Sequence, residues 1–320
     1  MTLGEIYRKG MEILEGKKFG FVLRGVETEY VIKHNEEIFR NYRFLQRAIN
    51  SIDVTTETRL LDVNLKVPII MSSMTMPITQ IQHNGLIKVA RALKETGSMM
   101  WVGSPIPSNL KELVAIGVPI VQTIKPFSDR AKVMEMLSQA EMAGVTWLGI
   151  EVDAGQGTKV LDKQVARDCS PMSVDELKEI KRSVSRPFVL KGILSPWDAE
   201  SALKVGADVI VVSNHGAHTI DYLPHPLEVI EEIDRVITKQ IPIIVDGGFR
   251  RGSDILKGLA FGAQAVGLGR PILYGLAAGG EEGVRTLITE LAEELRRAMT
   301  MTGVKDPSCA HQGIILQSSQ

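Results

Sequence analysis

The chain has 320 residues, of which 44% are hydrophobic and 23% charged, a composition typical of soluble globular proteins. Its 37 Lys and Arg against 38 Asp and Glu give a net charge of −1, which excludes a charge-driven affinity for nucleic acid or an anionic membrane. No uncharged apolar stretch reaches the roughly 18 residues that a membrane-spanning helix needs. The first turns carry Glu5, Arg8 and Lys9 instead of a signal-peptide core, and Cys169 and Cys309 cannot form a disulfide framework, so we expect a cytoplasmic protein with reduced thiols.

Residues 1–65 predict two helices, at about 3–15 and 30–40, and an extended stretch around 52–61. No linker rich in Pro, Ser or Gly separates them from the rest of the chain. We therefore expect this segment to form a cap on the remainder of the protein, not a separate domain.

From residue 66 onward, short apolar runs alternate with segments of helical period. The runs are apolar on both faces, as in strands that are buried on both sides. A helix at 173–184 shows the capping-box pattern of Ser173 and Glu176, and another helix is expected at 281–302. The eight predicted strands are 67–71, 98–102, 118–121, 146–150, 187–190, 208–212, 241–245 and 265–268.

Eight strands, each followed by a helix, predict a closed (β/α)8 TIM barrel, an α/β fold. An open doubly wound sheet is the alternative, but it usually has fewer strands and a G-x-G-x-x-G turn after the first one, and no such turn follows 67–71. We expect a single domain over 1–320, with the cap at 1–65, the barrel at 66–303 and a tail at 304–320.

Polar residues stand at the end of every predicted strand, and these ends meet at one face of a barrel, where TIM-barrel enzymes hold their active sites. The rim of a barrel ordinarily carries scattered charged residues. The charged side chains expected to meet here are more numerous than that: one Lys, one His, several acids and two Arg. The set comprises Ser72, Ser73, Thr75, Ser104, Gln122, Glu151, Asp153, Lys191, Ser213, Asn214, His215, Asp246, Arg250 and Arg270.

The last two strand ends predict a phosphate site. Asp246-Gly247-Gly248-Phe249-Arg250-Arg251-Gly252 leads into a helix, and Gly269-Arg270-Pro271 follows the last strand. Backbone N–H groups at glycines and at a helix start can cradle a phosphate, and two arginines can add bidentate bonds.

Lys191 and His215 are the candidate reactive groups. Lys191 ends an apolar strand, where its amine suits either a Schiff base or a fixed positive charge beside an electron-accepting ring. His215 also ends an apolar strand, and Asp153 lies at a nearby strand end, which suits a general base supported by a carboxylate.

Together these motifs resemble the FMN-dependent 2-hydroxy-acid oxidase and dehydrogenase family, which includes glycolate oxidase and lactate oxidase. The match is strongest over 187–303, in Leu190-Lys191-Gly192, Val212–Ala217, Asp246–Gly252 and Gly269–Pro271. A weaker match over 25–153 is carried by Asn35, Asp53, Pro68, Gln122 and Val152-Asp153.

The resemblance implies FMN at the barrel mouth, a small-molecule substrate and a homotetramer. His215 would take the proton of the substrate, backed by Asp153, while hydride equivalents reach flavin N5. Lys191 would face the N1/O2 edge of the flavin and Gln122 its pyrimidine side. The implied cofactor contacts are Gln122, Glu151, Lys191, Ser213 and Asp246, with Gly248, Arg250, Gly269 and Arg270 at the phosphate.

The departures from the family lie on the substrate side. The family reads His-Gly-x-Arg, and the carboxylate-binding Arg is replaced here by His218; two tyrosines align with Phe21 and Ile124. The second carboxylate-binding Arg has no clear counterpart, Lys159 being the nearest cation, and Thr is usual where Glu151 stands. We therefore expect glycolate and L-lactate to be poor substrates, and the natural substrate to be larger, more apolar or less anionic.

Three functions remain open on the sequence. The first is a flavoenzyme that oxidises an alcohol carbon, and the second is an FMN-dependent reductase or flavin-assisted isomerase on the same barrel. The third is a flavin-free binder of a phosphate ligand. Purified protein without yellow absorbance would support the third, and only the first should bleach its flavin with substrate alone.

Overall fold

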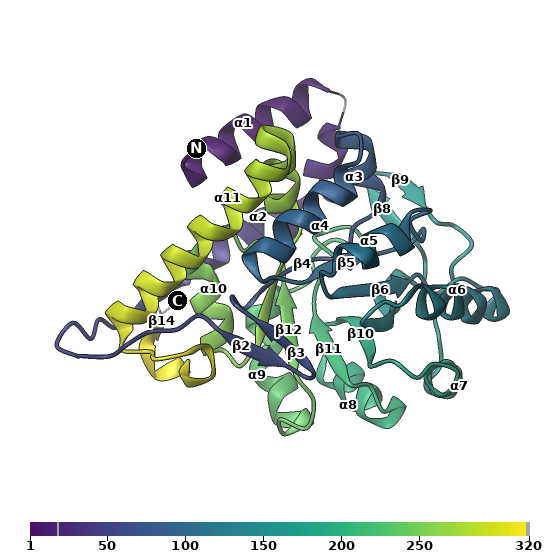
Figure 1. Ribbon diagram of the computed structural model, residues 1–320. Helices are drawn as coiled ribbons and strands as arrows, with labels where there is room; N and C mark the ends of the chain where they lie inside the picture. The colour runs from purple at the N-terminus through teal and green to yellow at the C-terminus, as the bar shows by residue number, and fades with distance from the viewer. Residues whose placement is uncertain (18, 318–320) are drawn as a thin grey trace.

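The computed structural model describes residues 1–17 and 19–317, and its centre is a ring of eight parallel strands (Figure 1). The strand order is β4-β13-β12-β11-β10-β7-β6-β5. Ile70 pairs with Met99 in a parallel bridge, and the Met71 N–H donates to the Met99 carbonyl at 2.9 Å, so the two ends of the sheet meet. The predicted TIM barrel is confirmed.

The strands fall on the eight apolar runs expected from the sequence. The largest difference is at the third strand, which continues to Ile124 instead of ending at Val121. The strands are β4 Ile69–Met71, β5 Met100–Val102, β6 Ile120–Ile124, β7 Trp147–Glu151, β10 Phe188–Ile193, β11 Val209–Val212, β12 Ile243–Asp246 and β13 Ala265–Leu268.

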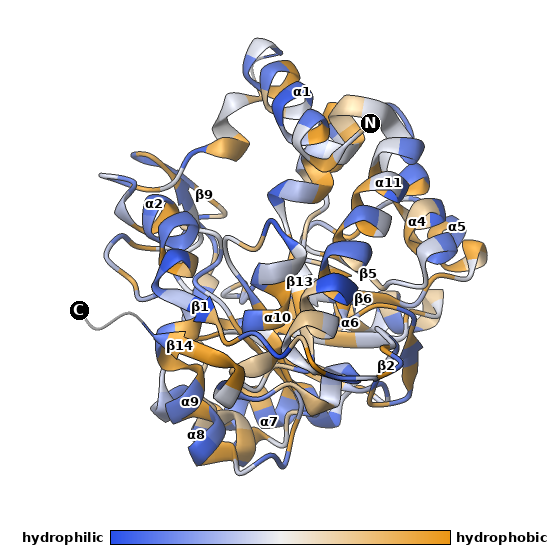
Figure 2. Ribbon diagram, turned by 90° about the vertical axis from the view of Figure 1, so that its left-hand side faces the viewer, coloured by the Kyte–Doolittle hydropathy of each residue, from blue (hydrophilic) through white to orange (hydrophobic). Residues whose placement is uncertain are grey.

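Helices surround the strands, and Figure 2 shows hydrophobic residues in interior strands such as β6 and β13 and hydrophilic residues on outer helices such as α8. The expected capping box of Ser173 and Glu176 starts α7. The last helix starts at Arg270, directly after β13, and breaks its helical geometry at Gly279 and Gly280. The helices are α3 Met76–Ile81, α4 Gly85–Thr96, α5 Leu110–Ile116, α6 Arg130–Ala143, α7 Val174–Arg182, α8 Pro196–Val205, α9 Pro226–Ile237, α10 Gly252–Ala260 and α11 Arg270–Thr302.

A short hairpin closes the bottom of the barrel. It consists of β2 (Thr58–Leu60) and β3 (Val63–Leu65), whose apolar side chains pack against the inward-facing residues of the ring. The Trp147 indole N–H donates to Asp62 in its turn at 3.0 Å. The stretch expected to be extended around 52–61 thus ends in a plug at the bottom, which leaves the opposite end of the barrel to the ligand.

The rest of the N-terminal segment lies along the side and the mouth. Helix α1 (Leu3–Gly16) lies beside α11, and α2 (Tyr30–Glu37) continues into a 3-10 turn at Ile38–Asn41 (Figure 1). Strand β1 (Tyr42–Phe44) pairs antiparallel with β14 (Ile315–Gln317), so the C-terminal segment folds back onto the cap. None of the described helices is both long and apolar enough to cross a membrane.

Candidate active site at the barrel mouth

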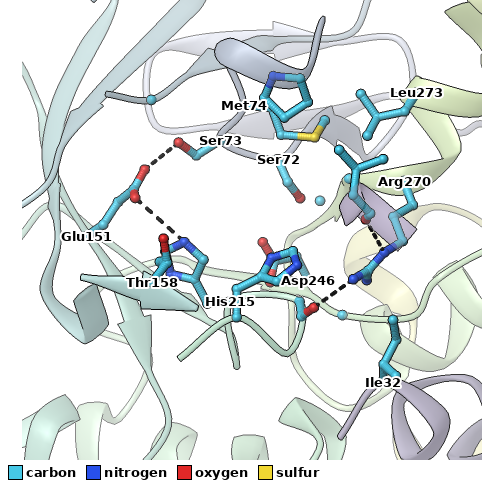
Figure 3. A pocket seen from close by; sticks show the side chains of 18 of the residues that line it. Ile32, Ser72, Ser73, Met74, Glu151, Thr158, His215, Asp246, Arg270 and Leu273 are labelled. Carbon is cyan, nitrogen blue, oxygen red and sulfur yellow. Dashed lines mark hydrogen bonds and ion pairs between the residues drawn. The ribbon is translucent and has the colours of Figure 1, made fainter. Parts of the chain in front are cut away.

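A cavity of about 260 Å³ opens at the C-terminal ends of the strands (Figure 3). Figure 3 shows Glu151 and Ser73 at one side of it, His215 in the middle and Arg270 at the other side. The β8–β9 hairpin (Thr158–Val160 and Lys163–Val165) contributes further wall residues. The described residues that line it include Ser72, Ser73, Met74, Ser104, Lys125, Glu151, Thr158, Lys159, Lys191, His215, His218, Asp246, Gly248, Arg250, Gly269 and Arg270.

His215 and Asp153 form a hydrogen-bonded pair at this mouth. His215 Nδ1 lies 2.9 Å from Asp153 Oδ2, and the side chains of both are largely buried. Asp153 reaches this place because Gly192 has no side chain: a Cβ there would lie 2.1 Å from the Asp153 carboxyl carbon. Burial alone would raise the pKa of Asp153, but the charges of His215 and Lys191 outweigh it and lower the pKa. An ionised Asp153 accepts from Nδ1–H, so whenever the ring is in its neutral form Nε2 is the proton acceptor.

The backbone at His215 is left-handed, with φ of 55°, and its N–H donates to the Ser213 hydroxyl at 3.0 Å. Gly216 and Ala217 also have positive φ, so three successive residues turn the chain sharply after β11. A non-glycine residue held in this region costs free energy and persists only where its surroundings fix it. The turn therefore aims the imidazole into the mouth instead of along the strand.

Lys191 is a fixed positive charge beside the pair. It is 3% exposed, and its Nζ donates to the Ser213 hydroxyl at 3.2 Å. Burial would lower the pKa of Lys191, but the carboxylates of Asp246, Asp153 and Glu151 outweigh burial and raise it. A Schiff base requires a neutral amine. The surroundings therefore favour the second of the two roles considered for Lys191, a permanent charge.

The two glycine-containing loops meet opposite the hydrogen-bonded pair. A Cβ at Gly248 would lie 1.8 Å from the Asn35 carbonyl, so only glycine lets this loop approach α2 so closely. Arg270 donates to three backbone carbonyls, those of Val22, Arg24 and Gly216, at 3.0 to 3.3 Å. Among the described residues no hydrogen bond is made by its Nη1.

Arg250, the other expected phosphate ligand, is paired with the carboxylate of Glu36 on α2. It nevertheless lines the cavity together with Gly248, Gly269 and Arg270. Helix α11 starts at this point, so its first N–H groups add to the positive potential. The loops after β12 and β13 thus have the chemistry of an anion site.

The walls of the cavity fit FMN. Two buried oxygens that line it, Ser72 Oγ and Asp246 Oδ1, have no hydrogen-bond partner among the described residues. A buried polar atom without a partner is costly, and a ligand can supply the missing bond. A flavin ring offers polar edges for such groups, Lys191 supplies charge beside it, and the anion site matches its phosphate.

The interpretation of the third strand is wrong by one residue. Ile124 packs in the apolar layer between strands and helices, and Gln122 donates to the carbonyls of Val102, Gly103 and Thr123; neither lines the cavity. Side chains alternate along a strand, so the inward positions are 121 and 123 in β6 and 125 directly after it. Lys125 therefore stands in the cavity wall, one residue after the position that the resemblance aligned with a tyrosine.

Glu151, at the end of β7, carries an ionised carboxylate in the same wall. Its Oε1 accepts from the hydroxyls of Ser73 and Thr123, the latter at 2.8 Å. Its Oε2 lies 3.6 Å from Lys125 Nζ and 3.8 Å from His215 Nε2. Burial works against ionisation, but the charges of Lys125, His215 and Lys191 with the Ser73 hydroxyl outweigh it, and the pKa of Glu151 falls to about 2.

The other expected substrate residues offer no free cation. His218 lines the cavity and its Nε2 lies 2.9 Å from the Arg24 carbonyl; burial, with the nearby Arg270 charge, lowers the pKa of His218 to about 3. Lys159 is paired with Glu27 at 3.2 Å. The side chain of Phe21 lies outside the described part of the chain. Sequence reasoning included Ser73 among the strand-end residues but missed Lys125 and Thr123, which the alternation along a longer third strand would have indicated.

Known proteins resemble this chain over nearly its full length. The model of the FMN-dependent dehydrogenase family matches residues 11–164 and 155–317. A 2-hydroxyacid oxidase of Dictyostelium discoideum is 30% identical over 98% of this chain and 90% of its own length. A 4-hydroxymandelate oxidase of Amycolatopsis orientalis is 29% identical over 98% of this chain and 97% of its own length.

Solved structures give the same result at the level of the fold. A mandelate oxidase with 3,3-difluoro-2-hydroxy-3-phenylpropionic acid superimposes with a TM-score of 0.90 at 28% identity, covering 99% of this chain and 98% of that one. A lactate oxidase of Pediococcus acidilactici superimposes with a TM-score of 0.92 at 28% identity, covering 100% of this chain and 95% of that one. These matches extend over cap, barrel and C-terminal segment together.

Proposed function

This chain belongs to the FMN-dependent dehydrogenase family, and we propose that His215 is the base with which it oxidises an alcohol carbon. The enzyme is an FMN-dependent oxidoreductase that acts on the CH–OH group of a 2-hydroxy acid or a related hydroxy compound. Reduction and flavin-assisted isomerisation are not favoured, since the Dictyostelium and Amycolatopsis relatives are oxidases. The observation that carries the proposal is the bond between His215 Nδ1 and Asp153, which directs Nε2 into the cavity.

Oxidation of CH–OH to C=O removes two electrons and two protons from the substrate. His215 Nε2 accepts the proton of the hydroxyl, and the Asp153 carboxylate offsets the positive charge that then arises on the ring. FMN, when bound, supplies the acceptor for the electron pair and the hydrogen of the carbinol carbon. Lys191 contributes a positive charge beside the ring that favours the arrival of electrons there.

We assign the cofactor contacts by their place in the wall. Gly248, Gly269, Arg250 and Arg270 would hold the phosphate, and Arg270 also ties the N-terminal segment to the mouth through the Val22 and Arg24 carbonyls. Ser213 would act through Lys191, whose ammonium it holds. Asp246, with a buried oxygen that lacks a protein partner, would face a donor on the cofactor or on a water beside it.

The natural substrate would lack a strongly bound carboxylate. A neutral His218 has no guanidinium fork, and Lys159 is neutralised by Glu27, so the site offers no pair of free cations. Glycolate and L-lactate should therefore be poor substrates, and affinity should come from apolar walls such as Met74, Val160 and Val165. Turnover of L-lactate with a KM well below about 1 mM would contradict this proposal.

The test of the base is His215→Gln. The variant should stay yellow with FMN but reduce its flavin more slowly by a factor on the order of 10²–10⁴ in anaerobic stopped-flow mixing with a working substrate. His34→Gln, a histidine paired with Glu228 on the outside, is the matched control and should reduce normally. Parental reduction rates in the His215 variant would refute the assignment.

The assembly and location of the protein complete the proposal. We propose one functional domain over 1–320, a homotetramer and a cytoplasmic location, supported by the family resemblance and by a near-neutral composition. Light scattering on the purified holoenzyme should give a mass near four times 35.1 kDa. A monomer or dimer at micromolar concentration would contradict the tetramer.

A further inference from the structure

We infer that Lys125 and Glu151 determine substrate choice, and that they select an uncharged 2-hydroxyamide-type group over a free 2-hydroxy acid. This inference rests on His215 as the proposed base, because its Nε2 fixes where the reacting hydroxyl lies. The resemblance implied Glu151 as a cofactor contact at a place where threonine is usual, and it aligned a tyrosine with Ile124. Ile124 does not line the cavity, and Lys125 stands in the wall beside Glu151 instead. Lys125 directly follows β6 and Glu151 ends the neighbouring strand β7, and their charged groups lie 3.6 Å apart.

One oxygen of the Glu151 carboxylate, Oε1, is held by hydrogen bonds, and the other, Oε2, accepts none from the described residues. Ser73 and Thr123 both donate to Oε1, and Thr123 is itself held by the Trp101 indole N–H at 3.0 Å. The residue is 3% exposed, so the carboxylate cannot turn away into solvent. Among the described residues no hydrogen bond reaches Oε2, which faces the cavity between Lys125 and His215.

Lys125 lies near Glu151, but its ammonium group is not hydrogen-bonded to the carboxylate. Its Nζ lies 3.6 Å from Oε2, beyond hydrogen-bond distance, and its side chain is 13% exposed. The backbone N–H of Lys125 donates to the Ser104 hydroxyl at 2.9 Å, which fixes the start of the side chain. The wall thus presents one donor and one acceptor side by side, and their charges cancel.

This pair discriminates between two isosteric groups on the carbinol carbon. Glu151 Oε2 is only 3.8 Å from His215 Nε2. When the substrate hydroxyl is hydrogen-bonded to His215 Nε2, the other substituents of the carbinol carbon therefore lie against Glu151 Oε2. A substrate carboxylate at this position can accept a hydrogen bond from Lys125. Its second oxygen then lies against the Glu151 carboxylate, which is also negative and has no proton to donate. A carboxamide offers its carbonyl to Lys125 and its N–H to Glu151, so both wall groups are satisfied.

The test uses matched substrates that differ only in this group: mandelate with mandelamide, and lactate with lactamide. In anaerobic flavin reduction the wild type should favour the amide in kcat/KM by about tenfold or more, the usual worth of one charge-assisted bond. Glu151→Gln should reverse this preference by about tenfold or more, chiefly by gaining activity on the acid, because its amide can donate to a carboxylate and Lys125 is released. A gain of activity cannot result from misfolding.

Four further measurements separate specificity from structure. Glu151→Thr should also gain activity on the acids, and Lys125→Met should lose activity on the amide mainly through KM. Glu200→Gln removes a carboxylate from the surface of α8, where it pairs with Lys204, and should leave the acid-to-amide ratio unchanged within about twofold. Dissociation constants of benzoylformate and benzoylformamide, read from the flavin spectrum without turnover, should follow the same order.

Two results would overturn the inference while the proposed function stands. One is a wild type that reduces faster with the acid than with the amide, and the other is a Glu151→Gln variant whose acid-to-amide ratio does not move. Failure of the function itself looks different, since His215→Gln would then reduce its flavin at the parental rate with every working substrate.

Discussion

Replacing Asp153 by Asn tests how much the hydrogen-bonded pair contributes to the reaction. The substitution keeps the size of the side chain and removes its charge. In the wild type the carboxylate lies 2.9 Å from His215 Nδ1, and both side chains are mostly shielded from water, at 13% and 15% exposure. The charge that His215 acquires with the substrate proton therefore forms next to Asp153, and the variant loses this compensation.

The expected loss has an upper and a lower bound. Two unit charges about 4 Å apart interact by about 4 kcal/mol at an effective dielectric near 20. If the Asn side chain keeps the hydrogen bond, only the difference between a charged and a neutral bond is lost, about 1 kcal/mol. These bounds correspond to a fall in the rate of flavin reduction of between about fivefold and a thousandfold.

The assay is anaerobic stopped-flow reduction at saturating substrate, with FMN content and the affinity for a 2-oxo product measured in parallel. The rate should fall while the binding of FMN and product changes little, because Asp153 stands behind His215 and does not itself line the cavity. Asp153→Ala should be at least as slow as Asp153→Asn. A reduction rate within about twofold of the wild type in Asp153→Asn would refute the electrostatic argument.

Arg270→Ala should weaken FMN binding by about tenfold or more, since it removes a charge at the proposed phosphate site, whereas Arg270→Lys should lose less. Unchanged FMN affinity on titration of the apoprotein would contradict this placement. Lys191→Met should lower the flavin reduction potential by about 30 mV or more, measured against a reference dye, while Lys204→Met on the surface should not move it. Equal potentials in both variants would remove Lys191 from the flavin edge. His225 is fully buried, and burial lowers its pKa from 6.5 to about 4. Between these pH values the histidine is protonated in the unfolded chain but not in the folded protein. The free energy of unfolding should therefore fall by up to about 3 kcal/mol as the pH falls from 6.5 to 4. Urea unfolding at several pH values should show a shallower loss in His225→Asn, and an identical slope would contradict the assignment.

The loops after β12 and β13 were predictable because their form depends on backbone. Gly248 is required by the close approach of Asn35, and such a requirement shows in the sequence as a glycine at a strand end. The loop at Gly269 and the start of α11 at Arg270 follow directly from where the last apolar run ends. The positions of His215 and Asp153 followed from the same reasoning, since both stand just after strands.

The substrate side was less predictable because it depends on which residues of each strand face the inside of the barrel. The sequence places the end of the third strand at Val121, but β6 continues to Ile124, and shifting the inward set by one residue replaces Gln122 with Thr123. Both residues are polar and fit a strand end, so composition does not choose between them. The plug formed by β2 and β3 was also not foreseen, since a short hairpin in a polar segment carries no periodic signal.

Lys125 and Glu151 show why the charged residues of this cavity wall depend on one another. A buried carboxylate without a cation would bear most of its desolvation cost uncompensated, several kcal/mol, and would tend to take up a proton. A buried ammonium without its carboxylate would face the same cost. Here Ser73 and Thr123 supply two hydroxyl donors to Glu151, and Lys125 supplies the opposite charge, so each residue is tolerated because of the others. A substrate group that both donates and accepts preserves this balance, whereas an added negative charge disturbs it.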